Sequence, residues 1–430
     1  MDNKQINTSF INPRRLALDA IEKILYKGAY SNIVISATLN KYLLEKKEKA
    51  LFTKLVMGTV ENKLTLEYYL EPYLKKKQKT WVHILLIMSL YQLIYLSIPE
   101  ASVVFEAVEL ANNRSQAVGA FVNAILRNFL KNPRRSLENL DELERLAIEF
   151  SYPQWLVAYL LKDYDYQSLY QIFKYFSLEK HDAIRVNTLK ATKEEVKLLL
   201  DQEGYQYQDS NLVKNGLIVE KSLIHHDLFK KGKITVQDIA SQMVSEILAP
   251  SKNANILDLC SAPGGKVAHL AALMNNSGSI FACDVYKHKL KLMEKTFERL
   301  GVTNVKPQLI DARNVYLQVK EASFDYVLAD LPCSGLGVMG NKVDLKYNIS
   351  LSSIDEVMSL QKEILSKTYM LVKKGGFFVI STCTINKAEN EELSRWFIKN
   401  YPEYEIISET INLPHLTNTD GFYICKLRRR

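Results

Sequence analysis

Two cysteines occupy positions at which a thiol can act as a nucleophile. Cys333 lies in the segment 329–335, ADLPCSG, and Cys383 lies in the segment 381–384, STCT; each segment includes the end of an apolar run that predicts a β-strand. Because the carboxyl ends of parallel strands meet at one edge of a sheet, we expect the two thiols to converge on one pocket. Such a pair favours covalent catalysis, which divides one difficult step into easier ones.

Three other roles for these cysteines remain open when each is taken alone. A free cysteine is commonly a small buried hydrophobic residue, and this role we assign to Cys260, Cys283 and Cys425. A metal site would need further ligands, which no C-x-x-C pair or nearby histidine supplies, so we predict no bound metal. A redox pair would normally show C-x-x-C spacing as well.

The residues that precede the thiols in the chain indicate a nucleoside-like cofactor. A predicted strand runs into a loop of small residues and then a helix, which makes a backbone cradle for a polar group. The loop comprises Cys260, Ser261, Ala262, Pro263, Gly264, Gly265 and Lys266. It fits neither the G-x-x-x-x-G-K-[ST] pattern of phosphate-binding loops nor the G-x-G-x-x-G pattern of dinucleotide-binding loops.

Aspartates at strand ends strengthen the case for a nucleoside. Asp258, Asp284 and Asp311 end three successive predicted strands. Asp284 is placed to accept hydrogen bonds from ribose hydroxyls, and Asp311 is placed to hold an exocyclic amine or ring edge. Any one of them, taken by itself, is equally well explained as a helix N-cap. Together with the glycine loop they favour S-adenosylmethionine over NAD.

A thiol is needed when the methyl acceptor is carbon 5 of cytosine, because this carbon is a poor nucleophile. A thiolate that adds to carbon 6 pushes electron density onto carbon 5, which can then attack a methyl group. A base afterwards removes the carbon 5 proton and the thiol is eliminated. Methylation of an amino group needs no thiol and commonly uses a [DN]-P-P-[YF] loop, which is absent from position 330 onwards.

Alternating strands and helices after Asn255 must position these residues, and they predict a mostly parallel, doubly wound, Rossmann-like sheet. The predicted strands are Ile256–Cys260, Ile280–Asp284, Pro307–Asp311, Tyr326–Asp330 and Phe377–Cys383. The predicted helices are His269–Met274, Lys287–Leu300, Ser353–Leu371 and Ala388–Lys399. Phe422–Leu427, after a glycine, is predicted as an antiparallel edge strand.

The first part of the chain, residues 1–136, is predicted to be an all-helical domain of five to seven helices. Apolar residues recur at helical spacing from Arg14 to about Arg135, and alternation typical of strands is absent. The apolar run His83–Ile98 is shorter than the roughly 18–20 residues that cross a bilayer. We therefore expect a helix buried in a soluble core.

Residues 137–250 are predicted to form linker helices and a small α+β unit, and residues 251–430 the catalytic domain. Ala183–Asn187 and Leu217–Val219 have the pattern of strands, and Lys193–Glu203 has that of a helix. No low-complexity segment or internal repeat interrupts this three-part organisation.

Charge is unevenly distributed along the chain. The protein has a net charge of +8, yet residues 1–135 hold 20 of the 56 basic and 11 of the 48 acidic residues, so they carry +9 and the remainder −1. Any single basic cluster, such as Lys75–Lys79, is better explained as a solvated helix face. Their concentration in one domain favours an RNA-binding surface.

Composition limits the class of protein and its compartment. A hydrophobic fraction of 47% and a charged fraction of 24% are ordinary for a globular protein and exclude a largely disordered or collagen-like chain. Five cysteines, an odd number, argue against a disulfide framework. The first residues lack the apolar core of a secretion signal. We expect a cytoplasmic protein.

The motifs resemble those of a known family. The segments DLCSAPGGK, ADLPCSGLGVMG and STCTINKAENEE resemble the RsmB/Sun (Fmu) branch of the NOL1/NOP2/Sun family, which are 16S ribosomal RNA cytosine-C5 methyltransferases. The resemblance implies that Cys383 is the nucleophile and that Cys333 assists release of the methylated product. It also implies that Cys260–Lys266, Asp284, Asp311 and Asp330 contact S-adenosylmethionine, with Asp330 in the catalytic set as well.

Upstream segments extend the resemblance over nearly the whole chain. RVNT at 185–188 and VQD at 236–238 resemble signatures of the family's RRM-like segment, and LVMGTVENK and FVNAILRN resemble its NusB-like RNA-binding domain. The family's basic segment after the P-C motif is replaced by Met339–Asp344, in which only Lys342 and Asp344 keep its character. Lys346 and Lys362 are candidates to supply RNA contacts there.

The sequence thus predicts a monomeric enzyme that methylates 16S rRNA at the cytosine 967 site typical of this family, with no DNA or membrane partner. Two alternatives remain: the same chemistry on another rRNA or a tRNA cytosine, and a non-catalytic RNA-binding assembly factor. A DNA cytosine methyltransferase is disfavoured, because those enzymes use a P-C thiol as nucleophile and lack the T-C partner.

Overall fold

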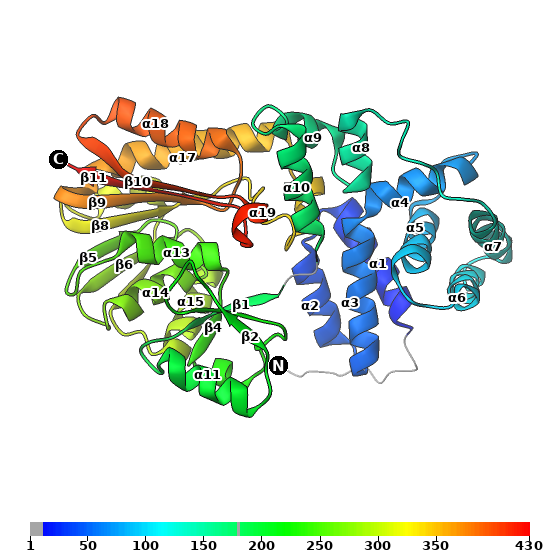
Figure 1. Ribbon diagram of the computed structural model, residues 1–430, viewed down its shortest axis with the longest axis horizontal. Coiled ribbons are helices and arrows are strands. Elements are labelled where there is room, and N and C mark those ends of the chain that lie inside the picture. Colours follow the sequence, from blue (N-terminus) through cyan, green and yellow to red (C-terminus); the bar gives the residue numbers. More distant parts are fainter. Residues whose placement is uncertain (1–11, 179–180) are drawn as a thin grey trace. The chain divides into compact units, whose positions relative to one another are not determined.

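The computed structural model describes residues 12–178 and 181–430 of the chain. These residues form two compact units (Figure 1). The helical unit contains the residues up to Ser177 together with the segment Met339–Asn348. The sheet unit contains Leu178–Val338 and Ile349–Arg430.

The helical unit contains an apolar core that is built by buried side chains between Leu16 and Phe129, together with Val343. Its helices are α1 (Pro13–Lys27), α2 (Ser31–Lys41), α3 (Lys46–Glu61), α4 (Lys63–Leu70), η1 (Glu71–Tyr73), α5 (Thr80–Tyr95), α6 (Glu100–Asn112), α7 (Gln116–Lys131), α8 (Glu142–Glu149), α9 (Gln154–Leu160), α10 (Tyr166–Ser177) and α16 (Leu345–Asn348). Residues 12–135 thus hold seven α-helices, which confirms the expected all-helical organisation.

Helix α5 confirms the interpretation of the longest apolar run. Its residues from Ile84 to Gln92 are all buried in the core of the helical unit. Inside the helix, Ser89 and Gln92 donate side-chain hydrogen bonds to the carbonyl oxygens of Leu85 and Met88, so burial leaves these donors satisfied. Among the residues that the structure describes, no helix is both long and apolar enough to cross a membrane.

The segment Met339–Asn348 is built into the helical unit although it lies far from its other residues in sequence. Val343 joins the apolar core. Ser31 Oγ donates to Asp344 Oδ1 at 2.5 Å, and Lys346 Nζ donates to the carbonyl oxygens of Glu61 and Phe150. Lys346 is only 3% exposed, so the expectation that it contacts RNA is wrong: its amine is used inside the protein. Lys362 is exposed on helix α17 (Leu351–Thr368).

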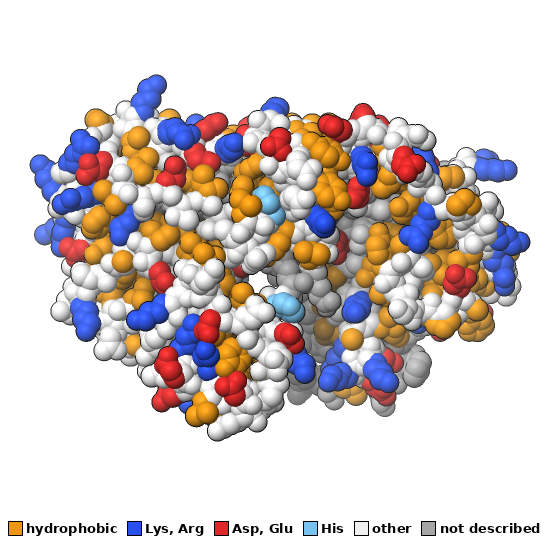
Figure 2. Space-filling model, viewed as in Figure 1, with side chains coloured by type: hydrophobic (Ala, Val, Ile, Leu, Met, Phe, Trp, Pro, Cys, Tyr) orange, Lys and Arg blue, Asp and Glu red, His pale blue; other side chains and the backbone are white. Residues whose placement is uncertain are grey.

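Charged side chains are mixed on the surface. On the face drawn in Figure 2, Lys and Arg side chains are interspersed with Asp and Glu side chains over both units. The distribution of charge therefore does not identify a binding surface on that face.

The sheet unit begins with a small α+β part, as predicted. Its antiparallel sheet has the strand order β2-β3-β1-β4. The elements are β1 (Asp182–Val186), α11 (Lys193–Gln202), β2 (Tyr207–Asp209), β3 (Gly216–Val219), α12 (Asp227–Lys230) and β4 (Ile234–Val236). Asn187 Nδ2 donates to the carbonyl oxygen of Leu300 at 2.8 Å, which attaches this part to the larger sheet's helix α15.

The larger sheet has seven strands in the order β10-β11-β9-β8-β5-β6-β7. Its elements are α13 (Ile239–Leu248), β5 (Asn255–Asp258), α14 (Gly265–Leu273), β6 (Ser279–Asp284), α15 (Lys287–Leu300), β7 (Val305–Leu309), η2 (Ala312–Leu317), β8 (Phe324–Asp330), α17 (Leu351–Thr368), η3 (Tyr369–Leu371), β9 (Val372–Thr382), η4 (Lys387–Glu389), α18 (Glu391–Asn400), β10 (Tyr404–Asn412), α19 (Pro414–Thr417) and β11 (Phe422–Arg429). Strands β5 to β9 pair in parallel, which confirms the doubly wound sheet.

Both faces of this sheet are covered, so its central strands are apolar on both sides. Along β8, Val327 and Ala329 pack with α17 and α18, while Tyr326 and Leu328 pack with α13, α14 and α15. Figure 1 shows these two groups of helices on opposite faces of the sheet. Successive side chains of β8 thus pack against opposite layers of helices.

Two strand predictions need correction. Strand β11 is antiparallel as expected, but it lies between β9 and β10 and is not an edge strand. The edge strand on this side is β10, Tyr404–Asn412, most of whose residues are exposed, and the sequence analysis predicted no strand there. Strand β7 ends at Leu309, so Asp311 lies two residues beyond it.

Candidate active site

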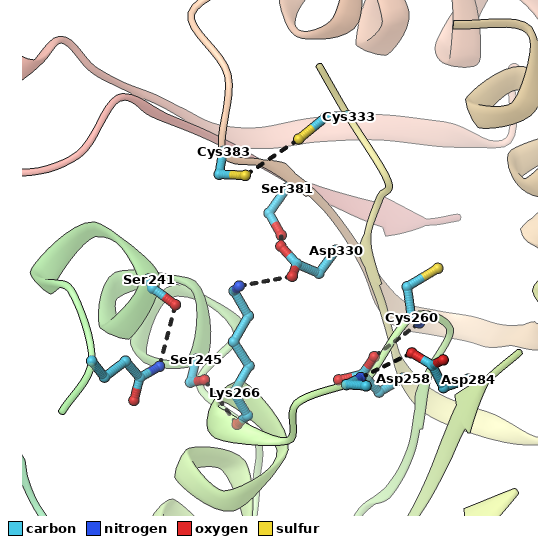
Figure 3. Close-up of polar contacts among 12 residues, drawn as sticks. Ser241, Ser245, Asp258, Cys260, Lys266, Asp284, Asp330, Cys333, Ser381 and Cys383 are labelled. Atoms are coloured by element: carbon cyan, nitrogen blue, oxygen red, sulfur yellow. Dashed lines mark hydrogen bonds and ion pairs between the residues drawn. The ribbon is translucent and has the colours of Figure 1, made fainter. Parts of the chain in front are cut away.

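The two predicted thiols meet in the sheet unit. Cys333 Sγ and Cys383 Sγ lie 3.4 Å apart, and neither is in a disulfide. Cys383 directly follows β9, and Cys333 follows β8, the parallel neighbour of β9. Figure 3 shows the two sulfur atoms facing each other. The sheet topology therefore brings together two residues that are 50 positions apart in sequence.

Asp330 occupies the end of β8 and is held from two sides. Lys266 Nζ donates to its Oδ2 at 2.7 Å, and Ser381 Oγ donates to its Oδ1 at 2.8 Å (Figure 3). Burial alone would lower the pKa of Lys266, but the charge of Asp330 and its hydrogen bond raise that pKa above its ordinary value. Asp330 thus joins the glycine loop to β8 through an ion pair and β9 to β8 through a hydrogen bond.

The surroundings of the two thiols are electrostatically unequal. A hydrogen bond with Cys383, followed by burial, raises the pKa of Cys333 well above its ordinary value, and the negative charge of Glu389 acts in the same direction. The positive charge of Lys266 instead interacts with Cys383. The proton of Cys333 is therefore held more tightly than that of an ordinary thiol, and a negative charge on Cys383 would interact favourably with Lys266.

Glu389 is a site residue that the sequence analysis missed. It is fully buried, and its carboxylate accepts hydrogen bonds from the backbone nitrogen of Ser334 at 2.8 Å and from the Ser334 hydroxyl. Gln361 Nε2 and Asn386 Nδ2 also donate to it, at 3.1 and 2.9 Å. Glu389 thereby ties the loop of Cys333 to the loop after Cys383. Its place in the NKAENEE segment, close to the T-C motif, was the available signal.

The glycine loop has the backbone geometry of a cradle. Gly264 has φ +96°, a left-handed conformation that favours glycine, and a Cβ there would lie 3.1 Å from Phe297. A Cβ on Gly265 would meet only Gln237, at 3.8 Å, so the space beside this glycine is open. Gly265 starts α14, whose first backbone N–H groups are available to a polar ligand.

Two aspartates border the same loop. Asp284 Oδ2 accepts a hydrogen bond from the backbone nitrogen of Ala262 at 3.3 Å, and its Oδ1 accepts one from Tyr286 N at 2.9 Å. Burial, and next the charge of Asp330, raise the pKa of Asp258 to about 7. Asp258 Oδ2 is buried and has no hydrogen-bond partner among the described residues. An open glycine cradle with carboxylate oxygens at its border fits a nucleoside with a charged tail.

Asp311 and Cys260 are placed differently from the other predicted residues. Asp311 caps η2 and accepts hydrogen bonds from the Arg313 backbone and guanidinium, which lower its pKa. Burial raises the pKa of Cys260 well above its ordinary value, so this thiol is not poised to react. Cys283 and Cys425 are buried in the apolar core, as predicted.

Comparisons with known proteins agree with this organisation. A family model described as 16S rRNA methyltransferase RsmB/F matches residues 245–428, and a NusB family model matches residues 11–131. A model of the RsmF/B-like ferredoxin-like domain matches residues 152–224. These matches confirm the fold class: a NusB-like all-α part, a small ferredoxin-like part and a Rossmann-like methyltransferase part.

Whole-chain relatives extend these matches. A probable ribosomal RNA small subunit methyltransferase B from Bacillus subtilis is 35% identical, with 97% of this chain and 98% of that protein covered. The ribosomal RNA small subunit methyltransferase B of Serratia proteamaculans is 31% identical, with 97% and 98% covered.

Solved structures show the same architecture. The crystal structure of PH0851 has a TM-score of 0.82 at 26% identity and covers 98% of this chain and 100% of that chain. A methyltransferase homologue from Pyrococcus horikoshii has a TM-score of 0.60 at 26% identity, covering 69% of this chain and 100% of that chain. With relatives matched over nearly its whole length, this chain belongs to the ribosomal RNA small subunit methyltransferase B (RsmB) family of S-adenosylmethionine-dependent enzymes.

Proposed function

We propose that this protein methylates carbon 5 of a cytosine in 16S ribosomal RNA, at the cytosine 967 site, through a covalent bond between Cys383 and carbon 6. The observation that carries the proposal is the 3.4 Å separation of the Cys333 and Cys383 sulfurs beside Asp330. Transfer to an amino group would not need two thiols at this place. The names of the relatives supply the ribosomal RNA substrate class.

The chain's own residues have distinct tasks toward the cofactor. Asp284 is suited to hold the ribose hydroxyls, and the open backbone of Gly264 and Gly265 is suited to hold the charged methionine end. Asp311 accepts a hydrogen bond from Arg313 Nη2 at 2.7 Å, and we assign its carboxylate a contact with the exocyclic amine or ring edge of the cofactor. S-adenosylmethionine supplies an electrophilic methyl group, and the protein supplies its orientation.

Cys383 and Cys333 share the work on the base. The Cys383 thiolate, favoured by Lys266, adds to carbon 6, and the new electron density makes carbon 5 nucleophilic. After methylation carbon 5 still carries its hydrogen, which leaves as a proton while the bond from carbon 6 to Cys383 breaks. Cys333, next to Cys383, is placed to assist this elimination, and one proton is released to solvent per turnover.

Asp330 orients the cytosine ring in this scheme. Lys266 and Ser381 fix its carboxylate at the end of β8, where Asp330 is paired with Ser381; Cys333 follows three positions later and Cys383 two positions after Ser381. A fixed carboxylate accepts a hydrogen bond from the 4-amino group of cytosine, which a uracil ring lacks. We assign RNA binding to the parts at 1–136 and 137–250 and chemistry to the part at 251–430, in a monomeric enzyme.

Tritium release tests this function directly. Ribosomal RNA of the small subunit, prepared with tritium on carbon 5 of its cytosines, is incubated with the protein and S-adenosylmethionine. We expect one tritium in water for each methyl group incorporated, and bisulfite sequencing to locate the modified base. Methyl incorporation without tritium release would contradict carbon 5 chemistry. A protein that binds this RNA but transfers no methyl group would instead be an assembly factor.

A further inference from the structure

A cavity in the helical unit lies outside the candidate active site. It is an open pocket of about 690 Å³ beside α4, η1 and the start of α5, and Tyr26 at the end of α1 and Ile148 on α8 also line it. Helix α4 contacts both α5 and α8 (Figure 1). A volume of this size is within the roughly 300–1,000 Å³ range of small-ligand sites. We call it the lysine pocket.

The rim of the lysine pocket carries uncompensated positive charge. Lys75, Lys76 and Lys77 are consecutive, exposed and lining the pocket, and none forms an ion pair with a residue that the structure describes. The acidic residues of the wall are already neutralised. Glu67 bonds to Lys63 and His83, both at 2.9 Å, and Glu71 bonds to Arg135 at 2.5 Å. The pocket therefore favours an anion.

The interior of the lysine pocket is largely apolar and aromatic. Tyr26, 48% exposed, and Tyr68 line it together with Leu64, Leu74 and Ile148. The Tyr68 ring is held firmly, because its hydroxyl donates to the carbonyl oxygen of Ser136 at 2.8 Å and the Arg135 guanidinium lies 4.1 Å from the ring centre. A flat aromatic ligand thus finds stacking partners next to cations.

We infer that the lysine pocket binds one unpaired nucleotide of the RNA substrate, with its base among Tyr26 and Tyr68 and its phosphate on Lys75–Lys77. Base stacking on aromatic rings combined with phosphate contacts is the usual chemistry of single-stranded RNA recognition. An acidic peptide would use the lysines but would leave the aromatic interior unfilled. The inference rests on the proposed function in that it takes the substrate to be RNA.

The test compares two charge-matched variants of the full chain. In one, Lys75, Lys76 and Lys77 are changed to Gln; in the control, the exposed lysines Lys46, Lys47 and Lys49 of the same unit are changed to Gln. Binding of a fluorescein-labelled decamer of uridine is measured over a range of salt concentrations. For single strands each lost phosphate contact reduces the salt slope by about 0.7, so the pocket variant, which loses its contact with one phosphate, should lose about 0.7 and the control almost nothing.

Base recognition is tested separately at Tyr26. Tyr26→Ala should weaken binding of the decamer about tenfold and leave binding of an abasic decamer unchanged, whereas Tyr26→Phe should bind normally. Equal slopes in the two lysine variants, or no effect of Tyr26→Ala, would overturn the inference. Polyglutamate that displaces the decamer at equal charge concentration would overturn it in favour of an acidic protein partner.

Methyl transfer separates this inference from the proposed function. At saturating ribosomal RNA the lysine variant should release tritium at the rate of the unmodified protein, with a raised KM. If even the unmodified protein releases no tritium, the proposed function fails, yet the decamer measurements still decide whether the lysine pocket binds RNA.

Discussion

Lys346 Nζ donates a hydrogen bond to the backbone carbonyl oxygen of Glu61 at 2.8 Å, across 285 positions of the chain. A second bond reaches the carbonyl oxygen of Phe150 at 3.2 Å, and the Tyr152 ring lies 4.3 Å from the amine. The two carbonyl oxygens, the Tyr152 ring and the nearby charge of Glu61 partly compensate the burial of this amine. The chain that leaves the Cys333 loop is thus anchored inside the helical unit.

This anchor predicts a dependence of stability on pH. Burial lowers the pKa of Lys346 to about 7 from 10.5. As pH rises from about 7 towards 10, the native protein binds fewer protons than the unfolded chain, so this group makes the protein more stable; below about pH 7 the full cost of burying the charge is present.

Lys346→Met removes that contribution. Between pH 6 and pH 9 the free energy of unfolding of the original protein should rise relative to that of the variant by up to about 2–3 kcal/mol, measured in urea. Lys342→Met, at an exposed lysine of the same segment, is the control and should show no such difference. A constant offset between Lys346→Met and the original protein at both pH values would contradict the account.

Glu389 is expected to position the Cys333 loop rather than to touch the substrate. Glu389→Gln replaces one carboxylate oxygen by an NH2 group that faces hydrogen-bond donors, so the loop must shift. Single-turnover methyl transfer should fall about 10–100-fold, while calorimetry should give unchanged S-adenosylmethionine affinity. Gln361→Leu should cause a smaller loss, because it removes only one of the four donors of Glu389. Unchanged transfer in Glu389→Gln would show that the loop needs no such anchor.

A larger side chain at Gly265 should fill the loop proposed to bind the cofactor without disturbing the fold. The nearest atom to a Cβ on Gly265 is 3.8 Å away, so Gly265→Val should fold normally and weaken S-adenosylmethionine binding at least about tenfold. Gly264→Val should in addition lose stability, because φ there is +96°.

Asp284→Ala should weaken cofactor binding about 10–100-fold, as expected for hydrogen bonds to a charged group. The matched control is Asp355→Ala, at an exposed carboxylate of α17, and its affinity should not change. If calorimetry shows that Gly265→Val and Asp284→Ala both bind S-adenosylmethionine as tightly as the unmodified protein, the assignment of the cofactor to this loop is wrong.

Local sequence patterns were sufficient to predict the helices and strands that carry the site residues. Helix Lys287–Leu300 has the predicted bounds, and the strands that end at Asp284 and Asp330 end there in the structure. Apolar runs bounded by turn residues identify buried parallel strands well, because both faces of such strands are covered. The edge strand β10 lacks this signal, since one side of it is exposed.

Long-range contacts could not be predicted in the same way. Lys346 has the sequence context of a surface lysine, and only the folded helical unit supplies the carbonyl oxygens of Glu61 and Phe150 that bury it. Glu389 likewise acquires its role from Ser334, 55 positions away. Periodicity reports which face of an element is buried, but not which distant polar groups meet there.

The covalent adduct tests the central claim most directly. Each thiol is changed to alanine, the protein is incubated with ribosomal RNA and S-adenosylmethionine, and the mixture is run on a denaturing gel with and without RNase. Cys333→Ala should accumulate a protein–RNA complex that RNase removes, because methyl transfer proceeds and elimination stalls. Cys383→Ala and the double variant should form no complex and transfer no methyl group. A complex in Cys383→Ala but not in Cys333→Ala would reverse the two roles, and no complex in either, with activity following stability, would contradict covalent catalysis.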